Sequence, residues 1–511
     1  MKRLLTLGAV ACACAVYAQT TEPETAAATE AATEAATAPE TAAASSSPEN
    51  YMRSSIYTFL LKSHQQNLKL DEEAKTEGAG AANLRVFSSS NARTNDSISV
   101  SEAPQLAFVK IAIPDQFNDH KLGTRVVLFD EIANSLTDDD KKAGEADLPK
   151  KKSGFGSFLV GLGKEAIGMK TNTTNDYFDE NVAAVTRKYL NTNHIADSIV
   201  ARWFDYGKTP EVWDLNLVIE RGMANASAED KELARAQGLS SGLGQREGLE
   251  LLKNTFVIAV NLRFRSNQAI VAEAESAAAG FLGADATSLL GTVASAAAGE
   301  GFQVQAHTYL YQLVWNEDKL NEFQEKIFAN KASLDDLISS GICQLVFVGK
   351  EKAGARVRQS LFNKTAQSTL IARATERAID AAIAKLQEKY DVFRTAFPIS
   401  AVDGEGNVMA KVGMKEGISK NDEYEILEQT IDKKGNLVWK SVGKVKAVDK
   451  KIWDNRVGAA EDFAEDQAEA QEKGKELSEE ANYANLGFTT FKGAKKNQDY
   501  TGYFLRLKKK K

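Results

Sequence analysis

Cysteine and histidine are scarce in this sequence. Its 511 residues include three cysteines, and two of these, Cys12 and Cys14, lie among the first 18 residues, so Cys343 is alone in the rest of the chain. A single cysteine cannot form an internal disulfide. The histidines form no HxxxH or HxH pair that would favour a metal site. They are His64, His120, His194 and His307. We therefore expect neither a disulfide nor a bound metal.

Two glycine-rich stretches look like phosphate-binding loops, but each lacks a required feature. In SGFGSFLVGLGKEAIG, Glu165 follows Lys164 at the position where a P-loop needs Ser or Thr to hold magnesium. In GLGQREG, Gly242–Gly248, the last glycine comes one residue late for a dinucleotide fingerprint. The three adjacent aspartates at 138–140 lack the alternating spacing of a calcium loop. These patterns predict no cofactor. A Ser-His-Asp triad has no fixed spacing in sequence, so an unrecognised hydrolase stays an alternative.

Long hydrophobic runs are missing as well. Leu4–Val16 follows a basic N-terminus and is too short to span a bilayer, as in a signal peptide. Small residues before Gln19 predict signal peptidase cleavage between Ala18 and Gln19. The alternatives are lipidation at Cys12 or Cys14, or an uncleaved anchor. Cleavage would leave the protein in the periplasm or associated with the outer membrane.

A second apolar stretch, Ser276–Gly299, consists mainly of Ala and Gly and has Asp285 near its middle. An aspartate at the bilayer centre costs about 2.5–3.5 kcal/mol, whereas each Leu or Phe contributes only about 0.3–0.6 kcal/mol in favour of insertion. The sequence therefore predicts no membrane span. We expect a helical hairpin packed on the domain, and the alternative is an element that faces a partner or a membrane surface.

The charge balance disfavours a general nucleic-acid-binding protein. The formal net charge is −7, and removal of Lys2 and Arg3 with the signal peptide would make it −9. Such proteins normally carry a net basic face. The C-terminal run Lys508–Lys511 is typical of a solvated tail rather than a binding patch.

Composition divides the chain into four parts, and the expected fold class is α+β. Few large apolar residues occur at 19–50, which predicts a disordered tether after the signal peptide at 1–18. Beyond residue 50, the apolar pattern predicts a mixed, largely antiparallel sheet with packed helices at 51–395, followed by a small β-barrel or β-sandwich at 396–511. We expect an excursion at 266–301 within the first domain and an acidic helical insertion at 461–482 within the second.

Apolar periodicity predicts the main elements. We expect a long helix at 366–393 packed across the sheet, a helix at 181–205 broken near 191–193, and two antiparallel strands at 255–265 and 302–315. Further strands are expected at 106–113, 125–129, 342–348, 408–413, 424–429, 437–442, 445–452, 486–492 and 500–507. The charged segment 137–153 is expected to form a loop.

Several residues could carry binding or reactivity. Trp203, Trp213 and Trp315 could stack on a small molecule, a glycan or a protein partner, although core packing is the usual role of a tryptophan. Cys343 lies in an apolar run and is expected to be a small core residue. Arg221, next to Glu220, is expected to form a local ion pair at a turn.

Two regions resemble known families. NHIADSIVARWFD, WDLNLVIERGMANASAEDKELA, NTFVIAV and FQVQAHTYLYQLVW resemble exported Bacteroidota proteins of unassigned function, over 106–393. AKVGMKEGISKNDEYEILEQ and GNLVWKSVGKVKAV are similar to the small C-terminal β-domain of flagellar-assembly and curli-secretion-type envelope proteins. The matching positions are Gly413, Gly417, Asn421, Asp422 and Tyr424, with Asn421 where glycine is usual. This resemblance implies an assembly or scaffold role and transfers no functional residue.

The sequence therefore predicts a non-catalytic envelope protein that acts through contacts with other envelope proteins, as a scaffold or adaptor. The first alternative is a periplasmic protein that binds a small molecule or a glycan, and the second is the hydrolase. We expect neither nucleic acid nor a membrane span, while association with a membrane surface remains open.

Overall fold

The computed structural model describes residues 54–63, 102–147, 176–266, 301–358, 365–431 and 437–510, with short gaps at 112, 114–116, 121, 208–211, 227, 473, 476 and 478–481. All of them belong to one compact unit. The expected signal peptide, the tether and the excursion at 267–300 lie outside the described residues, as does the glycine-rich stretch at 153–168.

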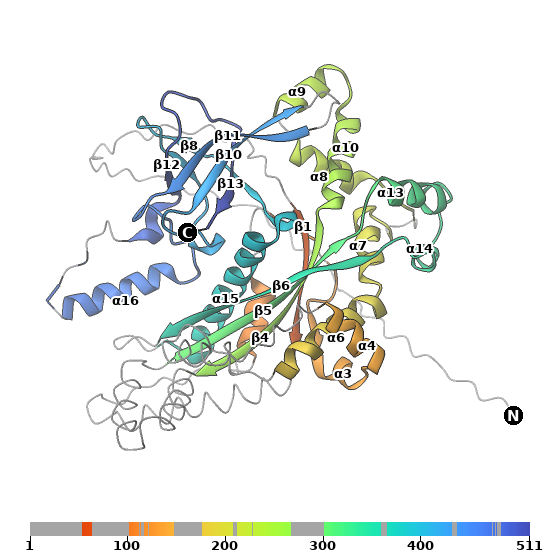
Figure 1. Ribbon diagram of the computed structural model, residues 1–511, viewed down its shortest axis with the longest axis horizontal. Coiled ribbons are helices and arrows are strands. Elements are labelled where there is room, and N and C mark those ends of the chain that lie inside the picture. The colour runs from red at the N-terminus through yellow and green to blue at the C-terminus, as the bar shows by residue number, and fades with distance from the viewer. Residues whose placement is uncertain are drawn as a thin grey trace, which may run out of the picture. The chain divides into compact units, whose positions relative to one another are not determined.

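The first sheet has the strand order β2-β1-β4-β5-β6, and β3 also pairs with β1. β1 is parallel to β2, β3 and β4, whereas β4, β5 and β6 are antiparallel neighbours (Figure 1). The expected antiparallel pair at 255–265 and 302–315 is therefore confirmed. The strands are β1 (Ser54–Lys62), β2 (Phe117–Asp119), β3 (Val126–Leu128), β4 (Thr255–Ser266), β5 (Gly301–Leu313) and β6 (Leu345–Arg358).

Both faces of this sheet are apolar and covered by helices. Along β4, Val257 and Ala259 face one core, while Phe256 and Ile258 face the other, because side chains alternate along a strand. The first core includes residues of α3, α6, α7, α8, α10, α13 and α14, and the second includes residues of α2 and α15. The helices are α2 (Ala103–Lys110), α3 (Phe129–Asn134), α4 (Asp138–Ala146), α6 (Asp176–Thr192), α7 (Ile195–Trp203), α8 (Asn216–Asn225), α9 (Ala228–Ala236), α10 (Ser240–Lys253), α13 (Glu317–Phe323), the π-helix η1 (Gln324–Phe328), α14 (Leu334–Ser340) and α15 (Gln367–Lys389).

The second sheet has seven antiparallel strands in the order β7-β13-β10-β11-β12-β9-β8. The α+β class is therefore confirmed, but the sheet is not a closed barrel, because no pairing joins β7 to β8 among the described strands. Its elements are β7 (Ala396–Pro398), β8 (Ala401–Val402), β9 (Val408–Ala410), the 3-10 helix η3 (Met414–Glu416), β10 (Glu423–Ile431), β11 (Leu437–Ala447), α16 (Ala459–Glu472), the 3-10 helix η5 (Tyr483–Leu486), β12 (Thr489–Lys492) and β13 (Phe504–Lys509).

Two expected elements have the wrong type. The apolar run at 106–113 lies mostly in the helix α2, which begins near Pro104, since proline is tolerated in the first turn of a helix. A short apolar run does not distinguish a buried helix from a strand. The expected loop at 137–153 contains the helix α4. A capping box formed by Thr137 and Asp140 stabilises the start of this helix.

Three expected strands have the wrong bounds. Cys343 precedes β6, which begins at Leu345, so this cysteine lies in the connection before the strand. The segments 437–442 and 445–452 belong largely to one strand, β11, in which a bulge opposite Ile426 and Leu427 shifts the register. A bulge bends a strand without ending it, which explains the apparent interruption of the pattern.

Candidate functional site

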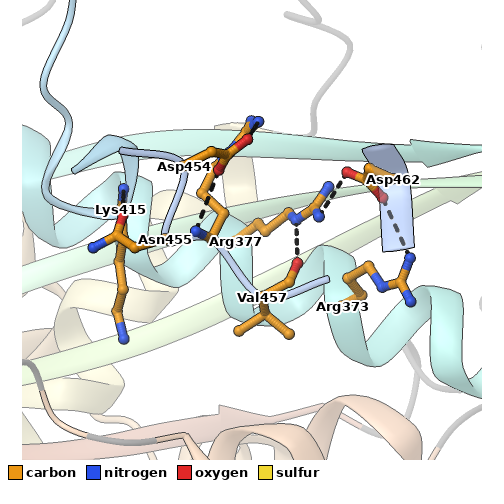
Figure 2. Close-up of polar contacts among 8 residues, drawn as sticks. Arg373, Arg377, Lys415, Asp454, Asn455, Val457 and Asp462 are labelled. Carbon is orange, nitrogen blue, oxygen red and sulfur yellow. Dashed lines mark hydrogen bonds and ion pairs between the residues drawn. The ribbon is translucent and has the colours of Figure 1, made fainter. Parts of the chain in front are cut away.

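Two arginines of α15 hold the segment that leads into α16 (Figure 2). Arg373 and Arg377 are one helical turn apart, so their side chains leave the same face of α15. Both reach Asp462, at N–O distances of 3.3 and 2.8 Å, and Arg377 also donates from Nε to the carbonyl oxygen of Val457 at 2.7 Å. Because Arg377 is buried, Asp462 supplies the countercharge that this guanidinium needs.

A second set of contacts fixes η3 next to residues 453–455, in the segment that leads into α16. The Asn455 side-chain oxygen accepts from the backbone N–H of Lys415 at 2.8 Å (Figure 2). The Asn455 amide nitrogen donates to Glu416 at 2.8 Å. Glu416 also accepts from the N–H of Gly413 at 2.7 Å. A Cβ at Gly413 would lie 2.2 Å from the carbonyl oxygen of Trp453, so only glycine fits this approach.

Asp380 lies in the same joint and is buried without a hydrogen bond. It is 5% exposed, neither carboxyl oxygen has a hydrogen-bond partner among the described residues, and the Lys415 ammonium is 4.0 Å away. Burial raises the pKa of Asp380 from 3.8 to about 7, and nearby Glu416 and Glu376 add to the rise, while Lys415 opposes it. Burial also raises the pKa of Glu376 and of Glu416.

A cavity of about 210 Å³ lies between α15 and the second sheet. Lys510 lies at its wall and donates to the Gly417 carbonyl oxygen and, at 2.8 Å, to the buried Asp422. The terminal lysine run is thus not wholly a solvated tail. The volume is below the roughly 300–1,000 Å³ of typical ligand pockets. The lining residues are Ala381, Ala384, Lys385, Gln387, Glu388, Arg394, Thr395, Phe397, Met414, Glu416, Gly417, Ser419, Tyr424, Leu507 and Lys510.

The three candidate tryptophans are core residues. Trp203, Trp213 and Trp315 are 0%, 7% and 6% exposed and belong to one apolar cluster under the first sheet. The Trp203 indole donates to Thr255 at 3.1 Å, and the Trp213 indole donates to the Ala332 carbonyl oxygen at 2.7 Å. Rings in these positions have no free face for a ligand at the surface, so the candidate stacking role is not supported and the usual core-packing role applies.

Arg221 lies inside α8 rather than at a turn. Its guanidinium is 4.5 Å from the Trp203 ring centroid, and it approaches Ser55 Oγ and His120 Nδ1, each at 3.2 Å. Burial and, to a smaller extent, the adjacent Arg221 charge lower the pKa of His120 to about 3. Because Arg221 donates to Nδ1, the other ring nitrogen, Nε2, carries the proton and donates to the Ile199 carbonyl oxygen at 2.9 Å. Both nitrogens are engaged, so His120 is a neutral structural residue.

Cys343 has a carboxyl neighbour that its sequence context did not reveal. The Cys343 thiol contacts Asp197, and His194 Nδ1 lies 3.8 Å from the same carboxyl group. Burial and the Asp197 charge raise the pKa of Cys343. A nucleophilic cysteine needs the opposite, a lowered pKa and a base in direct contact. The expected core role of Cys343 therefore agrees with its surroundings.

The glycine motif at 242–248 packs two helices together. A Cβ at Gly222 of α8 would lie 1.8 Å from the carbonyl oxygen of Gly244 in α10, and a Cβ at Gly248 would lie 2.0 Å from that of Val218. These glycines allow the two backbones to touch. Residues 238–242 read Gly-x-Ser-x-Gly, the pattern of a nucleophile elbow. An elbow joins a strand to a helix, whereas this stretch joins α9 to α10.

The adjacent aspartates at 138–140 form the first turn of α4, where acidic residues favour the helix dipole. Within the described residues, no group of three His, Cys, Asp or Glu side chains is placed to hold a metal ion. Likewise, none of the helices in this part of the chain combines the length and apolar character needed to cross a membrane.

Charged residues cover the second sheet across four strands. Glu425 of β10 lies between Lys444 of β11 and Arg506 of β13, and the Arg506–Glu425 ion pair measures 2.7 Å. Glu423, two residues earlier on β10, pairs in register with Lys446, and Lys444 lies 3.9 Å from its carboxylate. Glu423 and Glu425 thus lie among a larger number of lysine and arginine side chains on the neighbouring strands.

Some of these cations face one another. Lys446 of β11 is directly opposite Lys492 of β12, and contact with Lys444 lowers the pKa of Lys508. Like charges opposite each other destabilise a sheet. We call these four exposed residues, Lys444, Lys446, Lys492 and Lys508, the lysine face. Their arrangement suits an anionic partner, which would relieve the repulsion.

No protein-family model and no curated protein matches this sequence.

Proposed function

We propose that this chain is a non-catalytic protein of the cell envelope that is exported by its N-terminal signal and acts through protein contacts. The lysine face is the observation that carries the proposal. Lys446 and Lys492 leave opposite positions on hydrogen-bonded strands, so the sheet holds their Cβ atoms close together, and the four lysines outnumber the two glutamates beside them. An acidic protein surface would remove this repulsion, and such complementary charge speeds association and selects the partner.

The joint between α15 and the second sheet supports the proposal. α15 packs on the first sheet through one face, while Arg373 and Arg377 on another face hold α16 and its approach. A scaffold protein needs its contact surface in a fixed position relative to the rest of the molecule. The ion pairs from Arg373 and the buried Arg377 to the partly exposed Asp462 provide such a connection.

Site-specific photo-cross-linking in intact cells tests the proposal. A photoreactive amino acid at Lys446 should give a discrete adduct in the envelope fraction. The matched control is Lys142, an exposed lysine of α4. If Lys446 gives no adduct, or the same adducts as Lys142, the lysine face is not a contact surface and the proposal is wrong.

A second candidate function is binding of a small molecule in the cavity beside α15. The cavity combines an apolar lining from Phe397, Met414 and Leu507 with the polar side chains of Ser419 and Tyr424. Native mass spectrometry of the purified chain would then show a bound species that the variant Leu507→Trp, which fills the cavity, no longer retains. Identical spectra for both proteins would contradict this function.

A further inference from the structure

The cavity beside α15 has a tyrosine hydroxyl at its wall that the described residues leave without a hydrogen bond. Tyr424 of β10 is 2% exposed and lines this cavity, and its ring packs against Phe491 with the ring centroids 5.0 Å apart. Burial and nearby charges perturb the hydroxyl group, but no hydrogen bond joins it to another described residue. A buried polar group without a partner costs free energy, which a bound molecule can remove. The Tyr424 hydroxyl is therefore a point of attachment for a molecule in the cavity.

Glu388 places a carboxylate at the same cavity. This residue lies near the end of α15 and is half-buried. Its backbone carbonyl oxygen accepts from Arg394 at 2.9 Å, whereas its carboxylate forms neither a hydrogen bond nor an ion pair with any residue that the structure describes. Burial and three nearby carboxylates, one of which is Glu388, raise the pKa of the Tyr424 hydroxyl. The carboxylate and the hydroxyl are thus close enough to act on one small molecule.

The cations that line the cavity already have acceptors in the protein. Lys510 donates to a carbonyl oxygen and, at 2.8 Å, to Asp422, and Lys385 donates to a carbonyl oxygen of β6 at 2.8 Å. Arg394 donates to two carbonyl oxygens of α15 and pairs with Asp391 at 2.6 Å. A half-buried carboxylate without such a partner gains more from a ligand than these cations do, because charged groups need compensation when they leave water. The lining therefore favours a cationic ligand over an anionic one.

We propose that this cavity binds a small primary amine with an apolar body. The inference rests on the second candidate function, binding of a small molecule, and names the class of ligand. The ammonium group donates to the Glu388 carboxylate and to the Tyr424 hydroxyl oxygen, and the apolar body packs on Phe397, Met414 and Leu507. Hydrogen bonds between ionised groups are roughly twice as strong as neutral ones. The cavity volume of about 210 Å³ restricts the ligand to a small molecule.

Three probes of equal length test the charge of the ligand. Calorimetry at pH 7 compares n-hexylamine, 1-hexanol and hexanoate on the purified wild-type chain. Hexylamine should bind about tenfold more tightly than hexanol, because it replaces a neutral hydrogen bond with a charged one. Hexanoate should bind more weakly than either, because its carboxylate meets the Glu388 carboxylate. Equal affinities for hexylamine and hexanol, or tighter binding of hexanoate, would overturn the inference.

Two conservative variants test the proposed contacts. Glu388→Gln keeps the shape of the side chain and removes its charge, so it should weaken hexylamine binding about tenfold and change hexanol binding by less than about threefold. Tyr424→Phe removes only the hydroxyl group and should weaken hexylamine binding by about three- to tenfold. The matched control is Glu376→Gln, which changes a carboxylate of α15 outside the cavity lining and should bind as the wild type does. Thermal melting should show that all variants fold.

The cavity-filling variant Leu507→Trp separates the possible failures. It should lose hexylamine binding, and hexylamine that it retains is bound elsewhere, which contradicts the inference. Native mass spectrometry that shows a species retained by the wild type alone, together with no preference for hexylamine over hexanol, contradicts the amine but leaves small-molecule binding standing. If the wild type carries no such species and binds none of the three probes, both the inference and the second candidate function are wrong.

Discussion

Asp380 is the residue whose charge state most affects the joint between α15 and the second sheet. Its carboxyl group is buried and has no hydrogen bond among the described residues, and the Lys415 ammonium lies 4.0 Å away. Burial removes water from the carboxylate, and the resulting cost in free energy exceeds the attraction of the Lys415 ammonium. The protonated form is therefore favoured in the folded state, and the joint is sensitive to pH near neutrality.

Asp380→Asn should remove this sensitivity. The folded-state pKa of about 7 exceeds 3.8, so the folded protein keeps a proton that the unfolded chain releases between these values. Wild-type stability should thus fall as pH rises from about 4 to 7, by up to about 4 kcal/mol. The variant should lose less, so that it becomes the more stable protein at pH 8. Urea unfolding at several pH values measures the difference.

The matched control is Asp139→Asn, which changes an exposed aspartate of α4. It should leave the pH dependence as in the wild type. Parallel pH profiles for Asp380→Asn and the wild type would show that Asp380 is ionised in the folded protein.

Cys343 should be unreactive in the folded protein. Burial and Asp197 raise the pKa of its thiol, and the thiolate is the species that reacts with alkylating agents. In the chain that begins at Gln19, iodoacetamide at pH 8 should modify no thiol under native conditions and one thiol in guanidinium chloride. Mass spectrometry counts the added groups, and rapid labelling of the native protein would disprove the assignment.

At the scale of single elements, the contact between α8 and α10 depends on glycine. Gly222→Ala should destabilise the protein by about 3 kcal/mol, because its Cβ would lie 1.8 Å from a backbone oxygen of α10. The control is Gly242→Ala in the same helix α10, where a Cβ meets nothing within 4 Å. That substitution should stabilise the helix by about 0.5–1 kcal/mol. Denaturant unfolding compares the two, and equal effects would contradict the close approach.

The attachment of α16 to α15 depends on Asp462. Asp462→Ala leaves the buried Arg377 without its carboxylate, and we expect a loss of about 1–2 kcal/mol, because Asp462 is 38% exposed and partly screened. Amide hydrogen exchange should quicken at 457–472 and stay unchanged in the first sheet. Glu461→Ala, one residue earlier and exposed, should alter stability by less than about 0.5 kcal/mol. Equal exchange in both variants would show that the ion pairs do not hold α16.

At the scale of the whole molecule, the proposed N-terminal signal would decide the compartment in which these surfaces meet a partner. Protein isolated from the cell envelope should begin at Gln19. Ala18→Leu should block this cleavage, since the peptidase needs a small residue at that position, whereas Tyr17→Phe should be processed normally. Intact-mass measurement distinguishes the forms, and an acylated Cys12 or Cys14 would show lipidation instead.

The sequence predicted elements well where a strong period extended over many residues. The helix at 366–393 and the strand pair at 255–265 and 302–315 are long enough for their apolar pattern to identify their type. The run at 106–113 is too short for that, and it forms a helix because α2 packs in the same core as α15. The turn at Asn421 shows the effect of residue type on the local backbone. Its φ of 66° lies in the region that glycine and asparagine tolerate best.

Taken by itself, the sequence determined the α+β class, the apolar character of both main cores and the burial of Cys343, because these follow from residue type and local spacing. Only the tertiary structure decided which charges meet. Lys446 and Lys492 are 46 positions apart in the chain, and Arg377 and Asp462 are 85 positions apart. Strand register and helix packing bring each pair together, and a pattern read along the chain carries no information about such contacts.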